Sequence, residues 1–121
     1  MAHQTYQACI DACDSCGEAC DHCASACLQE GDVKSLAECI RLDLDCAAIC
    51  RVAPGAMARG SSAVAALCAA GAQVCDQCAQ ECDTHSRMER CRACVEACRA
   101  CAEECRRMAG RGATQRSAAM A

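Results

Sequence analysis

The cysteines, and the spacing between them, indicate the chemistry that this sequence can support. The chain has 18 cysteines among 121 residues, and the first six follow a 4-3-4-3-4 spacing. This spacing places every thiol of the segment on one stripe of an α-helix, where leucine normally lies. The same register recurs in three later segments, and the complete set is Cys9, Cys13, Cys16, Cys20, Cys23, Cys27, Cys39, Cys46, Cys50, Cys68, Cys75, Cys78, Cys82, Cys91, Cys94, Cys98, Cys101 and Cys105. All of these thiols are predicted to face one shared core.

Thiolates are soft ligands, and they select Cu(I), zinc or iron–sulfur clusters. Residues three or four apart on a helix have Cβ atoms ~5–6 Å apart, close to what a linear metal with two ~2.3 Å sulfur bonds requires. Zinc would need two such pairs facing each other, and the looped cysteine run typical of iron–sulfur ligation is absent from the sequence. One monovalent ion per thiolate also leaves a neutral core, whereas tetrahedral zinc leaves about two negative charges per site. The pattern therefore favours Cu(I) at about one ion per cysteine, which is ~18 ions for this chain.

Four helical segments are expected to position these thiols. They are expected over residues 4–30, from 32 or 35 to 52, from between 56 and 62 to 83, and 86–110. Ser35 with Glu38 and Ser86 with Glu89 have the spacing of capping boxes, and Pro54-Gly55 is expected to stop the second helix.

Four helices joined by short connections predict an all-α fold, an antiparallel up-down-up-down four-helix bundle with a cysteine-lined core. The thiols of the first helix extend over about 27 Å, so the core is a long tube and not a single site. Residues 1–110 are predicted to be the metal-binding bundle, and residues 111–121 a flexible basic C-terminal tail.

Four further side chains are candidate accessory metal ligands. Asp43 occupies a stripe position on the second helix and interrupts its thiols. His85 continues the stripe of the third helix toward one end of the bundle, and Met57 and Met108 lie toward the other. Thioether and imidazole groups bind soft or borderline metals and would pass metal inward. Alternatively, the two methionines simply plug one end.

Composition excludes several other classes of protein. The N-terminus has no secretion signal, so a cytoplasmic, reducing location is expected, and a loop-rich disulfide scaffold is disfavoured. No apolar run is long enough to cross a membrane, and the net charge of −4 argues against nucleic acid as a partner. No nucleophile with an adjacent base and no phosphate-binding glycine loop is present, so the protein is not expected to be an enzyme.

Three alternatives to a Cu(I) store stay open at this point. A zinc or mixed-metal thiolate buffer would use the same ligands, although the charge balance disfavours it. A thiol redox protein would expose a few thiols of depressed pKa. A nucleic-acid-binding regulator that uses the arginines of the tail is a weaker third, because a basic tail on an acidic domain is usually just solvated.

The cysteine pattern resembles that of the cytosolic copper storage proteins. The resemblance covers about residues 4–108 and rests on the run from Cys9 to Cys27 and on the run from Cys91 to Cys105. It implies four-helix bundles that hold many Cu(I) ions for high-capacity storage or sequestration, in copper homeostasis or detoxification. It also implies homotetramers. A copper chaperone or a cuproenzyme is a further candidate partner. Members commonly have His or Met near the mouth of the tube, for which His85, Met57 and Met108 are the candidates.

The second helix gives modest support for oligomer formation, independent of the family resemblance. Beyond its thiols it carries four large apolar side chains, more than a narrow core seam requires. These are Ile40, Leu42, Leu44 and Ile49. A partner bundle would cover them, or they belong to the flanks of the core.

Overall fold

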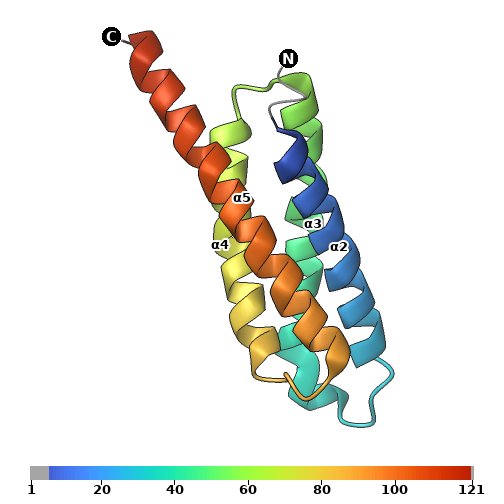
Figure 1. The fold of residues 1–121 in the computed structure, drawn as a ribbon. Helices are drawn as coiled ribbons and strands as arrows, with labels where there is room; N and C mark the ends of the chain where they lie inside the picture. Colours follow the sequence, from blue (N-terminus) through green and yellow to red (C-terminus); the bar gives the residue numbers. More distant parts are fainter. Residues whose placement is uncertain (1–5, 121) are drawn as a thin grey trace.

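The computed structural model describes residues 6–120, with side chains described to residue 110. Its elements are α2 (Gln7–Cys27), the short 3-10 helix η1 (Val33–Leu36), α3 (Ala37–Arg59), α4 (Val64–Asp83) and α5 (Glu89–Met120). The four long helices run alternately up and down (Figure 1). This arrangement confirms the predicted all-α, antiparallel four-helix fold.

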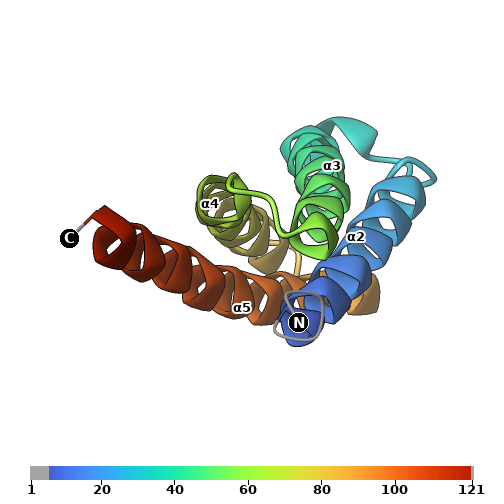
Figure 2. The ribbon, with the colours of Figure 1, turned by 90° about the horizontal axis from the view of Figure 1, so that it is seen from above.

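The helices form a ring around one core. Helix α2 packs against α3 and α5, and α4 packs against the same two helices. The view from above shows the four helices around a common interior (Figure 2). Small residues allow close approach there: a Cβ added at Gly71 would lie 3.5 Å from Cys105 Sγ, and one at Gly17 would lie 3.8 Å from Cys50 Cβ.

The expected stop at Pro54 is wrong, because α3 continues through this proline to Arg59. Proline has no N–H to donate to the preceding turn, which costs a helix stability. The residues around it compensate by burial, since Ala53, Ala56 and Met57 are at most 1% exposed. Tertiary packing therefore outweighs the local preference.

Helix α3 ends instead at Gly60. This glycine has a φ of 65°, in the left-handed region that favours glycine. The N–H of Gly60 donates to the carbonyl of Met57 at 3.1 Å, and the N–H of Ser61 donates to that of Ala56 at 2.9 Å. These two bonds form a Schellman motif, which satisfies carbonyls at the helix end.

Neither predicted capping box forms. Ser35 lies inside η1, and its hydroxyl donates to the carbonyl of Asp32 at 2.9 Å. Helix α5 begins only at Glu89, and the carbonyl of Ser86 accepts a bond from Arg92 Nη1 at 2.5 Å. The turns between helices are thus shaped by contacts that no local pattern specifies.

Helix α5 extends beyond the expected end near Gly110 and reaches Met120. Its C-terminal part projects past the other three helices (Figure 1). The division into a bundle of residues 1–110 and a tail of residues 111–121 stays a prediction. Within the described part of the chain, no helix combines the length and the hydropathy that a bilayer crossing requires.

Candidate metal centre

The stripes of all four helices meet in one thiol core. Every cysteine is a free, buried thiol, and the most exposed of them, Cys50, is only 3% exposed. The predicted shared core is therefore confirmed. The other buried residues in the described part of the chain are Ala, Ile, Leu, Val, Met and Gly, together with Asp43.

The sulfur atoms are close enough to form a continuous network. Near the start of α2, Cys105 Sγ lies 3.9 Å from both Cys9 Sγ and Cys13 Sγ. In the middle, Cys46 Sγ lies 3.6 Å from Cys16 Sγ and 3.5 Å from Cys75 Sγ. Each of these contacts joins different helices, so the network is a property of the bundle and not of a single helix.

The network continues to the opposite end of the tube. Cys39 Sγ lies 3.4 Å from Cys82 Sγ, and Cys23 Sγ lies 3.7 Å from Cys91 Sγ. Thiols thus line the tube over most of its length.

Sets of four ligand atoms within 4.8 Å of one another recur along the tube and share members. Cys16 belongs to a set with Cys46, Cys50 and Cys75 and to another with Cys20, Cys46 and Cys98. A three-coordinate metal with ~2.3 Å bonds places its sulfurs about 4.0 Å apart, and a tetrahedral one about 3.8 Å apart. Both fit the observed distances. Because the sets overlap, they do not fill independently as closed four-thiolate sites, and bridging thiolates are required.

Asp43 is a fully buried carboxyl group within the thiol core. Its Oδ1 accepts bonds from Cys78 at 3.2 Å, Cys94 at 3.3 Å and Cys82 at 3.5 Å. Its Oδ2 accepts a longer bond from Cys39 at 3.8 Å. Burial is the main cause that raises the pKa of Asp43 to about 10, and negative charge on the neighbouring cysteines Cys94, Cys78 and Cys39 adds to it. The side chain is therefore neutral at pH 7, and it links thiols of three helices.

Replacing Asp43 by Asn is expected to flatten the pH dependence of the stability of the metal-free protein. The folded pKa of about 10 lies above the unfolded value of ~3.9, so the folded chain holds one more proton between these pH values. The free energy of unfolding therefore falls by about 1.4 kcal/mol per pH unit as pH rises, and the Asn variant lacks this loss. Urea unfolding of the reduced protein from about pH 5 to about pH 7.5, below the range in which the thiols of the unfolded chain ionise, measures the slope.

The matched control is Asp45→Asn, which changes an exposed carboxylate on the same helix. It should keep the slope of the unmodified protein. A D43N slope equal to that of the control would show that the buried carboxyl is already ionised near neutral pH.

The thiols themselves are mostly held in the protonated form. Burial raises the pKa of Cys91 to about 11. Six thiols are exceptions, because hydrogen bonds with neighbouring cysteines lower the pKa values of Cys16, Cys39, Cys50, Cys78, Cys94 and Cys105. The pKa of Cys39 falls to about 3, through its hydrogen bonds with Cys23 and Cys82. Hydrogen bonds with Cys23 and Cys39 raise the pKa of Cys82 in turn. A metal that enters this core displaces protons from most of its ligands.

The two ends of the tube differ in polarity. Met57 near the end of α3 and Met108 on α5 are 0% and 5% exposed, and both belong to the apolar core. At the other end, His85 lies in the turn after α4, where its Nε2 lies 3.1 Å from Glu81 Oε2. The arrangement brings each candidate to the predicted end, and the ligand roles of these three side chains remain predictions.

Sequence reasoning missed two side chains at the His85 end. Arg90 Nη2 donates to Cys27 Sγ at 3.7 Å and to Met88 Sδ at 2.9 Å. Met88 lies three residues before Cys91, a spacing that continues the stripe of α5 backward. That spacing was the available signal for Met88, but the position of Arg90 between two sulfur atoms depends on the approach of α2 to α5.

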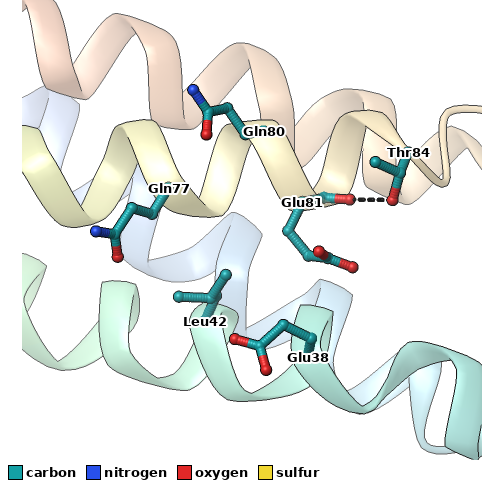
Figure 3. Close-up of a pocket in the computed structure, with 6 residues that line it drawn as sticks. All are labelled: Glu38, Leu42, Gln77, Gln80, Glu81 and Thr84. Carbon is teal, nitrogen blue, oxygen red and sulfur yellow. Dashed lines mark hydrogen bonds between the residues drawn. The ribbon is translucent and has the colours of Figure 1, made fainter.

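A separate groove lies on the outside of the bundle between α3 and α4 (Figure 3). It has a volume of about 480 Å³, and Glu38, Leu42, Gln77, Gln80, Glu81 and Thr84 line it. Thr84 Oγ1 donates to the carbonyl of Glu81 at 2.6 Å. Amide and carboxylate groups are hard ligands, so this groove does not belong to the thiolate centre.

Four antiparallel helices around a continuous core of buried thiols define a metal–thiolate binding protein. Residues 2–110 match the copper storage protein family. The chain belongs to this family.

Solved structures of copper storage proteins are similar over most of the chain. The Cu(I)-bound copper storage protein BsCsp3 is 46% identical with a TM-score of 0.81, covering 85% of this chain and 96% of that one. A cytosolic copper storage protein from Streptomyces lividans, in a structure with five coppers, is 38% identical with a TM-score of 0.85, covering 90% and 95%. The Streptomyces lividans copper storage protein loaded with 10 copper equivalents is 38% identical with a TM-score of 0.84, covering 88% and 85%. No curated protein matches the chain.

Proposed function

We propose that this protein is a cytosolic, high-capacity Cu(I) storage and sequestration protein. Its ligands are the thiolates of the 18 core cysteines, at about one Cu(I) per cysteine. The observation that carries this proposal is the continuous network of buried thiols, in which sets of potential ligands share members along the whole tube. Membership of the copper storage protein family supports it, as do the Cu(I)-bound and copper-loaded structures of similar proteins.

Charge balance favours copper over zinc in this core. The described buried residues include no Lys or Arg, and Asp43 is the one buried acidic group among them. Uncompensated charge costs several kcal/mol per buried ion, a large share of a total stability of about 5–15 kcal/mol. Cu(I) at one ion per thiolate keeps the core neutral, whereas zinc at four thiolates leaves about two negative charges at each site.

Loading exchanges protons for copper. Each Cu(I) that binds a protonated thiol forms a copper–sulfur bond and releases one proton to solvent, with no change in oxidation state. Copper uptake is therefore expected to become tighter as pH rises. Because one proton leaves for each Cu(I) that binds, the net charge of the core does not change as it fills with metal.

An anaerobic titration tests the proposal directly. The fully reduced protein is titrated with Cu(I) against a competing chromophoric chelator, and elemental analysis gives the final metal content. We expect tight uptake of roughly one Cu(I) per cysteine and release of about one proton per copper. Saturation at four or fewer ions would contradict storage and direct attention to zinc or to thiol redox chemistry.

Four side chains other than cysteine are proposed to assist copper binding. Met57 and Met108 serve as thioether ligands or as an apolar plug at one end, and His85 serves as a ligand at the other. Asp43 joins a set with Cys23, Cys39 and Cys82, so it supplies a ligand oxygen there once it loses its proton.

The proposal also covers the oligomeric state of the protein and the proteins that exchange copper with it. We propose a homotetramer, supported by family resemblance and by Leu44 and Val52 on α3, which are 53% and 50% exposed. Ile40 is buried, and Leu42 and Ile49 pack against the core, so they belong to its flanks. The molar mass of the protein in solution tests the tetramer. A copper chaperone or a cuproenzyme is the proposed partner. No catalytic reaction is assigned to the protein.

A further inference from the structure

A pocket of about 240 Å³ lies in the side wall of the tube, between α2 and α3. Its lining consists of Cys13, Asp14, Gly17 and Glu18 from α2 with Cys50 and Arg51 from α3. Both of these cysteines belong to the thiol core, since Cys101 Sγ lies 3.7 Å from Cys13 Sγ and 3.8 Å from Cys50 Sγ. The pocket therefore connects solvent with the core through the wall of the bundle.

The absence of a side chain at Gly17 leaves space next to Cys50. A Cβ at position 17 would lie 3.8 Å from Cys50 Cβ and 4.0 Å from the carbonyl oxygen of Ala47. Cys50 is also the most exposed of the core cysteines, although it is only 3% exposed. A small molecule in the pocket can thus approach core sulfur, whereas a folded protein is too large to enter.

The outer part of the pocket carries charges of both signs. Asp14 and Glu18 are exposed, and neither carboxylate has a hydrogen-bond or ion-pair partner among the described residues. Arg51 is 61% exposed, and its Nη2 pairs with Asp21 Oδ2. A guanidinium has five N–H donors, so Arg51 can bind a second carboxylate as well. These charges suit a zwitterion, with its ammonium group near the two acids and its carboxylate near Arg51.

We infer that this pocket binds a small thiol that carries both an amine and a carboxylate, and that this thiol withdraws stored Cu(I) through the wall of the tube. The volume lies below the ~300–1,000 Å³ of pockets for drug-sized ligands, so it fits a molecule of amino-acid size. A cysteine within a protein chain lacks both charges beside its thiol, which favours a free small molecule. This inference rests on the proposed function of Cu(I) storage.

The withdrawal step is a ligand exchange that balances in protons and charge. The sulfur of the small thiol forms a bond to Cu(I), the bond from copper to Cys50 Sγ breaks, and the proton of the small thiol passes to Cys50. A second small thiol replaces the remaining protein sulfur in the same way. Copper stays in the +1 state throughout, so no oxidant or reductant takes part.

Copper release from the fully loaded protein tests the inference, with cysteine as the probe and a chromophoric Cu(I) chelator as the anaerobic reporter. We expect the cysteine-dependent rate to saturate with cysteine concentration, as binding at a site requires. Arg51→Gln should raise the half-saturating concentration about threefold, the effect of losing one exposed ion pair. It should leave release by cysteamine, which has no carboxylate, unchanged. Arg41→Gln, another exposed ion-pair residue on α3, is the matched control and should match the unmodified protein.

Two further variants test the acidic side and the space beside Cys50. Asp14→Asn combined with Glu18→Gln should weaken the action of cysteine and of cysteamine at least about threefold, but not that of 3-mercaptopropionate, which has no amine. Gly17→Ala should slow release by all three thiols, because its methyl group narrows the approach to Cys50. Gly110→Ala on α5, where an added Cβ meets nothing within 4 Å, should not slow it.

Three results would overturn the inference. They are a release rate that stays proportional to cysteine concentration, equal effects of Arg51→Gln on cysteine and cysteamine, and release from Gly17→Ala at the rate of the unmodified protein. In each of these cases a full copper content leaves the proposed storage function intact. Failure of the unmodified protein to load copper overturns both.

Discussion

Copper loading is expected to raise the unfolding temperature of the reduced protein by more than about 10 °C. A ligand present at 1,000 times its Kd stabilises the folded state by about 4 kcal/mol per site, and each kcal/mol shifts Tm by roughly 2–8 °C. The thiol network joins all four helices, so ions bound between helices crosslink elements that separate on unfolding. Far-UV circular dichroism melts of the copper-free and loaded protein under anaerobic conditions measure the shift.

A strong Cu(I) chelator supplies the control for this melting experiment. Removal of copper from the loaded protein should return the unfolding temperature to that of the copper-free protein, because the thiols and not a covalent change carry the effect. An unchanged melting temperature after full loading would place the copper outside the folded core. A lower one would show that binding requires the bundle to open.

Replacing Cys16, Cys20 and Cys98 by Ser is expected to remove at least about three Cu(I) ions from the capacity of the protein. The three sulfurs lie in mid-tube, with Cys98 Sγ 3.7 Å from both Cys16 Sγ and Cys20 Sγ. Each belongs to more than one contact in the network, so loss of bridging thiolates should lower the count further. Serine oxygen is a hard ligand of similar size, which retains the fold but not the copper.

The control for the triple replacement puts serine at exposed alanines of three helices, Ala8, Ala48 and Ala100. Both variants should keep the helical far-UV signal, and only the cysteine variant should lose copper, as counted by elemental analysis. Full capacity in the cysteine variant would mean that copper does not occupy the middle of the tube.

Cysteine spacing alone was enough to place the thiols. A 4-3 spacing follows the helical period closely enough that every cysteine of a segment stays on one face. The four stripes are then buried together when the helices pack around one core. The thiol-lined core followed from this spacing, and the antiparallel order of the four helices followed from the short connections between them. The family of the chain was visible in the same residues.

Local signals near the helix ends were less informative. Pro54 marks a stop by its own chemistry, yet the buried side chains of Ala53 and Met57 carry α3 past it. Ser35 has the spacing of a cap, but η1 occupies that turn. Helix ends depend on the packing of the following segment, which a short sequence window does not contain.

The surroundings of the polar side chains in and beside the core depend on how the helices pack. Asp43 appears in the sequence as an interruption of a stripe, whereas its carboxyl accepts bonds from thiols of α3, α4 and α5. Arg90 appears as one surface arginine among several, whereas its guanidinium lies between Cys27 and Met88. Helical periodicity specifies the face of its own helix on which a residue lies. Its neighbours across the core depend on the distance between the helix axes and on how far each helix is shifted along the next.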